Sequence, residues 1–361
     1  MTISSLPSYP SKTIPKGAWD THHHIFEPDI FPFASGRHFT PARASLSDLQ
    51  AFEKSLGVQN VCIAHGLSYG PDCSSLLYFL EQFNAPAHDP KAEKEEHDRS
   101  RPIQARGICV LDINTVTDDV LDAYHAAGIR SVRIDFFREK AMHDVEVQKR
   151  LIKTTGARLE NWWRSRRARE DGCTKQGHND NGTGKWSIQI QQPHLEHWPH
   201  LRASITRSPL PVVVDHFALV PGSSHRFGDG STCIQDARHL RSEERDGLEA
   251  LRELLRGGNL WMKLSAPYRC SNLAPGYEDL QWLVRFLVNS NPERVLWGSD
   301  WPHTQRHEDR VGKSASQEEA FLQVDDKAWA EALSRWVSQR EWELMWVGNP
   351  RVLYDYDDEG V

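Results

Sequence analysis

One pattern repeats along most of the 361-residue chain: a short apolar run rich in β-branched residues, then a longer stretch with helical periodicity. The apolar runs are eight in number: Ala18–Phe26, Asn60–His65, Ala105–Asp112, Ile129–Phe136, Trp186–Gln191, Pro211–His216, Asn259–Ser265 and Arg294–Asp300. Two parallel strands need a crossover connection between them. Alternation of strand and helix therefore predicts a parallel sheet with helices outside it.

Several stretches between these runs carry the start and stop signals of helices. Residues 45–57 and 117–128 each open with a capping pattern and close on glycine, and residues 243–258 and 277–291 are similar. Eight strand–helix units predict a (β/α)8 TIM barrel, an α/β fold in a single domain. An open doubly wound sheet is the alternative. It usually carries a glycine-rich phosphate loop after its first strand, and residues 27–37, EPDIFPFASGR, lack one.

Composition separates a short tail from the barrel domain. Residues 1–16 are rich in Pro and Ser and are predicted to form an N-terminal tail, with the domain at 17–361. Three charged or turn-rich stretches, at about 86–101, 166–185 and 221–245, are predicted to be inserted loops. The third directly follows the sixth strand, on the face where barrel active sites lie.

Charge and cysteine usage narrow the class of protein. The net charge is −7, which argues against nucleic acid as a partner. No apolar run has transmembrane length, and the N-terminus lacks a secretion signal, so we expect no membrane partner. Six scattered cysteines without a CxxC pair indicate free thiols and a cytoplasmic location. The basic, aromatic stretch 161–170 predicts a solvated face or a subunit contact in a homo-oligomer.

Ionisable side chains end the first, sixth and eighth strands. Strand alternation places Asp20, His22 and His24 on one face and His23 on the other. His216 ends the sixth strand and Asp300 ends the eighth. Polar groups at buried strand ends need partners, and barrel chemistry gathers at the carboxyl ends of the strands. We therefore predict one site there.

Other polar residues flank these strand ends. Alternation predicts that Asp215 faces away from His216 and supports the structure or orients a neighbour. The fourth strand carries Arg130 and Arg133, and Tyr268 and Arg269 follow the seventh strand. Buried arginine is rare without an anion to bind, so these residues favour an anionic ligand. The alternatives are a salt bridge from Arg133 to a nearby acid and a capping role for Arg130.

Four stretches carry a resemblance to a known family: DTHHHIF from residue 20, VVVDHF from 212, WMKLSAPYR from 261 and RVLWGSDWPH from 294. They resemble the amidohydrolase superfamily (amidohydrolase-related family 2), in the branch of the 2-pyrone-4,6-dicarboxylate lactonases and sugar lactonases. The resemblance implies a TIM-barrel hydrolase that opens a small anionic lactone, carboxylated or aromatic-derived, in aromatic catabolism or secondary metabolism.

The same resemblance implies residue roles. Asp300 would take a proton from water, and His22, His24 and His216 would line the site and polarise the carbonyl. Carboxylates or the ring oxygen would be bound by Arg130, Arg133 and Arg269. The further substrate-binding candidates are Tyr69, Tyr268, Gln189, Gln191, His65 and His303.

The branch is implied to work without a metal or other cofactor. The fifth strand offers Gln189 and Gln191, which are poor zinc ligands, although His194 follows them. The alternative is Zn²⁺ bound by His22, His24 and Asp300. Two other functions stay open: a metal-dependent non-oxidative decarboxylase of an aromatic or muconate-type acid, and a barrel that binds without catalysis.

Overall fold

The computed structural model describes residues 8–85, 104–171, 186–228 and 232–354. Each predicted apolar run coincides with one strand of a single eight-stranded sheet, and only β4 (Gln104–Cys109) begins a residue before its run. The strands are β1 (Trp19–His23), β3 (Asn60–Ala64), β4 (Gln104–Cys109), β5 (Ile129–Arg133), β6 (Ser187–Ile190), β7 (Val212–Val214), β8 (Leu260–Leu264) and β9 (Val295–Trp297). They follow one another in chain order, and each is parallel to the next. A separate pair, β2 (Thr40–Pro41) and β10 (Glu318–Glu319), lies outside this sheet.

The first strand and the segment around the last strand close the sheet into a barrel. The Thr21 hydroxyl donates to the carbonyl of Trp297 over 2.6 Å. Beyond the last strand, the backbone N–H of His24 donates to the carbonyl of Trp301 over 2.8 Å. The predicted (β/α)8 TIM barrel is confirmed.

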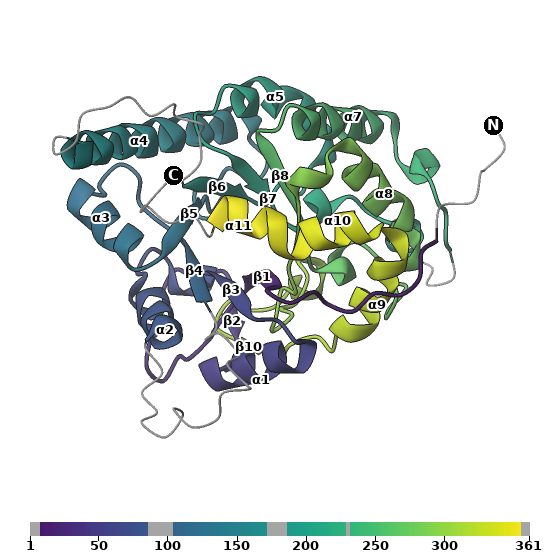
Figure 1. Ribbon diagram of the computed structural model, residues 1–361, viewed down its shortest axis with the longest axis horizontal. Helices are drawn as coiled ribbons and strands as arrows, with labels where there is room; N and C mark the ends of the chain where they lie inside the picture. The colour runs from purple at the N-terminus through teal and green to yellow at the C-terminus, as the bar shows by residue number, and fades with distance from the viewer. Residues whose placement is uncertain (1–7, 86–103, 172–185, 229–231, 355–361) are drawn as a thin grey trace.

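Helices surround the barrel (Figure 1). They are α1 (Leu46–Leu56), α2 (Ser74–Asn84), α3 (Asp118–Ala126), α4 (Val145–Asp171), α5 (Trp198–Thr206), α6 (Ser223–Phe227), α7 (Ser242–Arg256), α8 (Gln281–Ser290), α9 (Asp326–Trp336), α10 (Gln339–Glu343) and α11 (Asn349–Tyr354). The signals read from the sequence act as expected in α1. Ser45 and Asp48 form a reciprocal capping box, and Gly57 ends the helix with φ of 81°.

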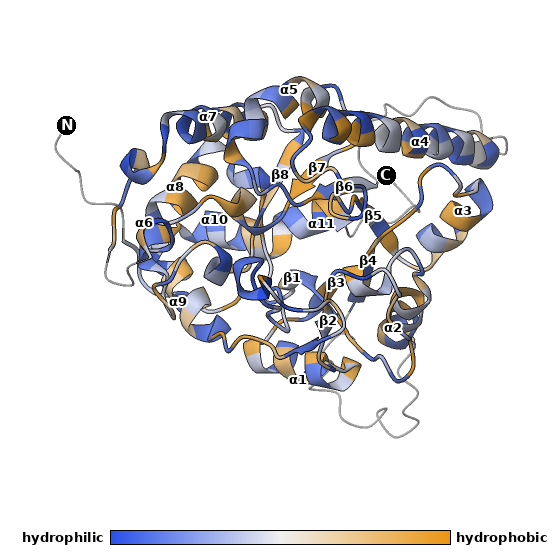
Figure 2. Ribbon diagram, turned by 180° about the vertical axis from the view of Figure 1, so that it is seen from behind, coloured by the Kyte–Doolittle hydropathy of each residue, from blue (hydrophilic) through white to orange (hydrophobic). Residues whose placement is uncertain are grey.

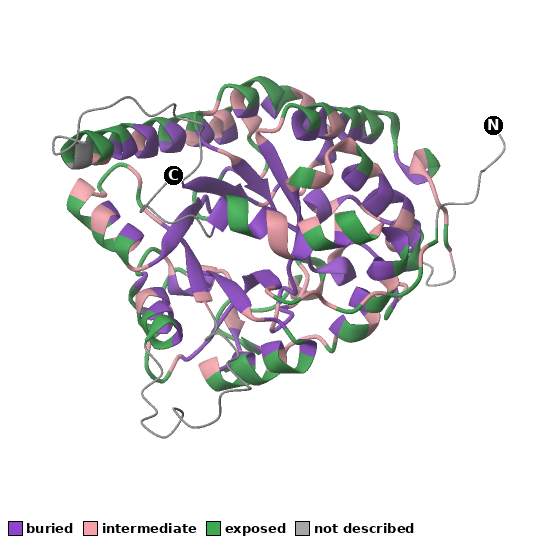
Figure 3. Ribbon diagram, in the orientation of Figure 1, coloured by how far each residue is buried: buried purple, intermediate pink, exposed green. Residues whose placement is uncertain are grey.

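The core has two layers. Apolar faces of the helices pack on the outside of the strands, whereas the strands themselves are buried almost throughout (Figures 2 and 3). A smaller cluster fills the barrel near the strand starts and includes Trp19, Trp261, Leu353 and Tyr354. The last two belong to α11, which lies across the strands in Figure 1. The barrel is therefore plugged at this end, and only the other end is left for a site.

The predicted inserted loops need correction. Residues 166–171 are the end of α4, because Arg166 and Arg169 form ion pairs with Asp122 of α3 and hold the basic helix in place. Residues 221–245 contain α6 and the start of α7. Here the Ser224 hydroxyl and backbone N–H both donate to Asp279 and anchor α6. Residues 86–101, 172–185 and 229–231 lie outside the described residues.

The described part of the tail, residues 8–16, lies against the C-terminal helices. The Tyr9 backbone N–H donates to the carbonyl of Arg335, and the Lys12 ammonium donates to the carbonyl of Val337 over 2.7 Å. Among the described helices, none combines the length and the apolar character that crossing a membrane requires.

Candidate active site

Asp300 is the centre of a buried cluster beyond the carboxyl ends of the strands. Its Oδ2 accepts hydrogen bonds from the Tyr268 hydroxyl at 2.5 Å and from Nη2 and Nε of Arg269 at 3.1 and 3.2 Å. Its Oδ1 faces three imidazoles, with Nε2 of His22, His24 and His216 at 3.4, 3.7 and 3.8 Å. The four predicted catalytic residues therefore lie together.

The second nitrogen of each imidazole has its own partner. Nδ1 of His24 donates to the carbonyl of Ala64 over 2.8 Å. Nδ1 of His216 lies 2.9 Å from the Ser265 hydroxyl, and Nδ1 of His22 lies 3.1 Å from Oδ1 of Asp215. These partners fix the ring orientations, as outer partners of ligating histidines commonly do. Each Nε2 is thereby aimed at Asp300.

Burial and neighbouring charge set the protonation states. Burial lowers the pKa of His22 to about 4, against the opposing effect of Asp215, and it lowers the pKa of His216 well below its usual value. Burial alone would raise the pKa of Asp300. His216 and Arg269 outweigh burial and hold this pKa well below the ordinary range. At neutral pH the cluster thus holds neutral His22 and His216 beside an ionised carboxylate.

Asp215 corrects a sequence expectation. It was predicted to face away from His216, yet both side chains reach the cluster. The strand β7 ends at Val214, and residues 216–219 all have φ between 52° and 56°, so strand alternation no longer applies. Asp215 accepts a hydrogen bond from Gln189 and lies 3.4 Å from Nη2 of Arg133. Its contact with His22 agrees with the expected role of orienting a neighbour.

Alternation predicted that Asp20 lies on the same face as His22 and His24, but the structure places its carboxylate elsewhere. The pairing of β1 with β3 shifts between Asp20 and His23, and this irregularity turns the Asp20 carboxylate to the backbone N–H groups of His22 and Ser299. Oδ2 of Asp20 lies 3.5 Å from Nδ1 of His23, the residue predicted to face away. The wholly buried Glu53 lies beside them.

The three arginines predicted to bind substrate lie in two different places. Arg133 and Arg269 line a small inner cavity at the cluster, together with Gln191, whose Oε1 accepts from Arg133 over 3.2 Å. Arg130 is not among the residues that line it. It stands near the start of β5 and donates to the carbonyl of His125 over 2.8 Å. A separation of three residues along one strand is enough to place the two guanidinium groups toward different ends of the barrel.

The other predicted substrate contacts lie around the inner cavity rather than in its wall. Gln189 is buried beneath it and accepts from Lys263 over 2.7 Å. The ring of His65 contacts the carbonyl of Gly70, and the Tyr69 hydroxyl accepts from the backbone N–H of Glu27. His303 lies 3.0 Å from Asp326 and packs edge-on to Tyr268. Of this group, only Tyr268 contacts Asp300.

Sequence reasoning missed part of the cavity wall. The inner cavity measures about 50 Å³, room for a few water molecules. Its remaining lining residues are Phe26, His38, Phe39, Gly66, Leu67, Thr304, His307 and Arg310. Arg310 stacks on Phe39 with its guanidinium carbon 3.9 Å from the ring centre. The sequence signal for Arg310 was the polar run HTQRHEDR after Asp300. Lys263, a charged residue inside the apolar run LWMKLS, was the signal for the buried polar contact with Gln189 beneath the cavity.

The donor set fits a divalent metal. His22, His216 and Asp300 offer ligand atoms within 4.8 Å of one another, and Nε2 of His22 is buried without a hydrogen-bond partner in the described part of the chain. Imidazole and carboxylate are ordinary zinc ligands. The alternative set from sequence held His24 in place of His216. Among the described residues, Asp20, His23 and Glu53 form a second group of this kind.

Comparison with known proteins gives a consistent picture. Residues 180–355 match the family model described as Amidohydrolase. The chain is 26% identical to a 2-pyrone-4,6-dicarboxylate hydrolase of Comamonas testosteroni, covering 82% of this chain and 80% of that protein. It is 26% identical to a 4-sulfomuconolactone hydrolase of Rhizobium radiobacter, covering 81% and 78%. A solved structure of a probable 2-pyrone-4,6-dicarboxylic acid hydrolase from Acinetobacter baumannii, 18% identical, has a TM-score of 0.63 over 94% of this chain and all of that one.

Proposed function

Because residues 180–355 match the amidohydrolase family model and relatives named as lactone hydrolases align over most of the chain, we propose that it is a hydrolase that opens the ring of an anionic lactone. The main support is that three imidazoles, a tyrosine and an arginine all face the carboxylate of Asp300. Relatives named as lactone hydrolases support this reaction over binding without catalysis. The substrate class, a carboxylated or aromatic-derived lactone, follows from the arginines of the inner cavity.

Asp300 acts as the general base. Its Oδ2 is held by Tyr268 and Arg269, so Oδ1 is the oxygen that meets a water molecule. Nδ1 of His24 donates to a carbonyl, so in the uncharged tautomer of this ring Nε2 is the acceptor. Oδ1 and this Nε2 together orient the two protons of the water, and Oδ1 takes one of them as the oxygen attacks the lactone carbonyl.

His216 supplies a donor to the carbonyl oxygen. The Ser265 hydroxyl accepts from the backbone N–H of His216 over 3.3 Å and donates its own proton to Nδ1. A neutral imidazole that accepts at Nδ1 carries its proton on Nε2. This N–H faces the cavity and stabilises the negative charge that develops on the carbonyl oxygen. The alkoxide of the ring oxygen then leaves with the proton that Asp300 received.

Arginine binds the acidic group of the substrate. Arg133 lines the cavity beside Gln191, and Arg310 lines it from the segment after β9. Guanidinium groups bind carboxylates through paired N–H donors. Arg310 pairs with Glu319 through Nε and keeps Nη2 without a hydrogen-bond partner among the residues that the structure describes. Arg269, by contrast, uses both Nε and Nη2 on Asp300 and also donates to Thr304. We assign recognition to Arg133 and Arg310, and positioning of the base to Arg269.

We propose that hydrolysis proceeds without a metal. The cavity already contains three guanidinium groups, and one of them neutralises Asp300. A divalent cation would meet their repulsion. If zinc is bound, His22, His216 and Asp300 are the residues that hold it, and it would activate water and polarise the carbonyl. The cytoplasmic location also stays a proposal, supported by five free cysteines among the described residues.

A lactone panel in ¹⁸O-water tests the proposal. The purified protein is incubated with pyrone dicarboxylate, muconolactone-type and sugar-acid lactones, and products are identified by mass spectrometry. The expected result is a hydroxy acid or its keto tautomer with one ¹⁸O in the new carboxylate, with no release of carbon dioxide. Carbon dioxide release from an aromatic or muconate-type acid, with no ring opening, would favour the decarboxylase instead.

A further inference from the structure

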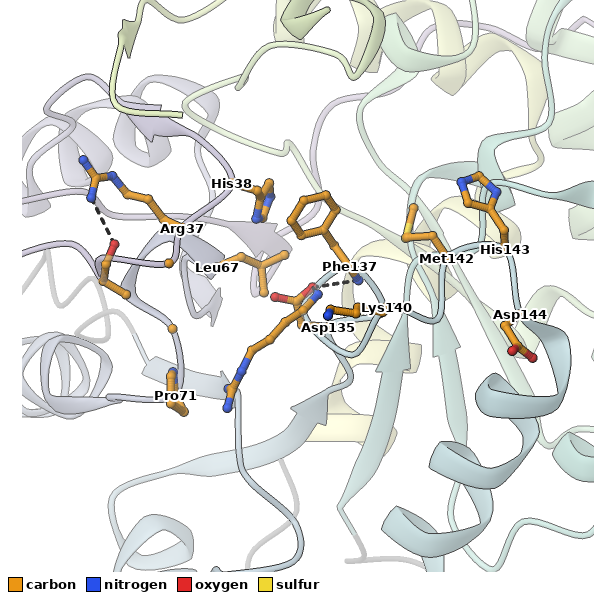
Figure 4. Close-up of a pocket in the computed structure, with 14 residues that line it drawn as sticks. Arg37, His38, Leu67, Pro71, Asp135, Phe137, Lys140, Met142, His143 and Asp144 are labelled. Atoms are coloured by element: carbon orange, nitrogen blue, oxygen red, sulfur yellow. Dashed lines mark hydrogen bonds between the residues drawn. The ribbon is translucent and has the colours of Figure 1, made fainter. Parts of the chain in front are cut away.

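A second and larger cavity, the outer groove, adjoins the inner cavity. It measures about 880 Å³, within the range of small-molecule sites. Its walls come from the segments after β1, β3 and β5, so it opens on the same barrel face as Asp300. His38 and Leu67 line both cavities and form their common wall. Figure 4 shows both residues beside Phe137 in the middle of the groove.

Apolar side chains form the part of the groove next to this wall. Phe137 is 48% exposed and packs against His38, with ring centres 4.6 Å apart and ring planes tilted by 42°. Leu67 and Met142 lie near it in the same cavity. A large aromatic ring that remains half exposed at the mouth of a site is a natural contact for an apolar part of a ligand.

Positively charged side chains lie along the rim of the groove. Arg138 and Lys140 are exposed, and within the described part of the chain neither forms an ion pair. The two acids of the groove are engaged by backbone groups. Asp135 accepts from the N–H groups of Phe137 and Arg138, and Asp144 caps the start of α4. The groove is lined by three cationic side chains, those of Arg37, Arg138 and Lys140, against these two carboxylates, so its net charge is positive and favours an anion.

We propose that the lactone carries a substituent several atoms long, apolar beside the ring and anionic at its end, that lies in the outer groove. The proposal rests on the proposed function. The ring reacts at Asp300, the chain of the substituent passes His38 and Leu67 and packs on Phe137, and its anionic end meets Arg138 and Lys140. An inner cavity of about 50 Å³ has no room for such a substituent, whereas the groove beside it does.

The test compares three lactones with the same ring: one unsubstituted, one with a phenylalkyl carboxylate, and one with the matching amide. The charge-reversal variant is Arg138→Glu combined with Lys140→Glu. For the carboxylate lactone we expect its KM to rise about tenfold or more at nearly unchanged kcat. The amide and unsubstituted lactones should keep their KM. Phe137→Ala should raise KM for both substituted lactones. The exposed Arg207, at the end of α5 next to the opposite face of the barrel, provides the control Arg207→Glu.

Equal kcat/KM for the substituted and unsubstituted lactones, or an unchanged ratio in the charge-reversal variant, would overturn the outer-groove assignment while leaving lactone hydrolysis intact. If none of the lactones is opened, the proposed function fails instead. The groove is then judged by calorimetric binding of the intact carboxylate compound. Binding that weakens about tenfold on charge reversal supports the groove, and binding that is absent or insensitive contradicts it.

Discussion

The backbone N–H of Asp300 donates to the carbonyl of His22 over 2.7 Å, and the side chains of the same two residues face each other at 3.4 Å. The contact that closes the barrel thus also places the base beside its first imidazole. Asp300 has φ of 66°, a left-handed conformation that directs its carboxylate over the barrel mouth. The same pair of residues therefore contributes both to closure of the barrel and to the geometry of the site.

Replacing Asp300 by Asn should remove the base and preserve its shape. We expect kcat to fall by about 10²–10⁴-fold, the usual contribution of general base catalysis, with KM changed much less. Steady-state kinetics on the best lactone of the panel measures this. Asp309→Asn, in the same loop but paired with Arg306, is the control. A variant with the rate of the unchanged protein would remove Asp300 from the mechanism.

Chelation should leave activity intact if the metal-free mechanism holds. The protein is dialysed against a strong chelator, its metal content is measured by plasma mass spectrometry, and its rate is compared before and after. We expect the same rate at a metal content far below one ion per chain. Loss of activity that Zn²⁺ restores would instead assign His22, His216 and Asp300 as its ligands.

Arg133 and Arg130 provide a matched pair on one strand. Arg133→Gln should raise KM for a carboxylated lactone by about tenfold or more with a smaller effect on kcat, because a desolvated charge contact is lost. Arg130→Gln should leave KM unchanged, since its guanidinium contacts His125 near the start of β5. The comparison fails if both variants, or only Arg130→Gln, weaken binding.

His65 should make stability fall in mild acid. Burial lowers its pKa to about 4 from an unfolded value near 6.5, so between these pH values the unfolded chain binds a proton that the folded chain does not. Stability contributed by the neutral ring is present above pH 6.5 and is lost as pH falls toward 4. His65→Gln should therefore lose less stability from pH 7 to pH 5, by on the order of 2 kcal/mol. Urea unfolding at both pH values measures this, and the exposed His200→Gln is the control. Equal losses would refute it.

Glu53 should have the opposite pH dependence. Burial, and next the charge of Asp20, raise its pKa well above the ordinary value, so the folded chain keeps a proton that the unfolded chain releases above about pH 4.5. Stability then falls as pH rises. Glu53→Gln should be increasingly stabilised relative to the unchanged protein, by up to about 1.4 kcal/mol per pH unit above that point. Parallel stability curves from pH 5 to 7, like those expected for the exposed Glu81→Gln, would contradict this.

Much of the fold could be read from local patterns. Alternating apolar runs located all eight strands, because burial of both faces of a parallel strand leaves a continuous apolar segment in the sequence. Polar strand ends located His22, His24, His216 and Asp300 for a similar reason. A charged group that ends an apolar run needs a partner at the same barrel face.

The errors occurred where the chain departs from regular geometry. The irregular pairing within β1 moved Asp20 away from the site, and the left-handed turn after β7 moved Asp215 into it. Residues 166–171 read as a loop by composition, yet ion pairs to α3 hold them in a helix. None of these is set by residue type alone, since each depends on a neighbour distant in sequence.

The sequence by itself determined the barrel, the face on which its chemistry lies and the four groups at its centre, because strand period and burial are local properties. Only the tertiary structure decided which nitrogen of each imidazole faces Asp300, which arginine reaches the cavity and that a second groove adjoins it. Those features depend on the packing of loops that follow different strands. Contacts between such loops do not produce a periodic pattern in the sequence.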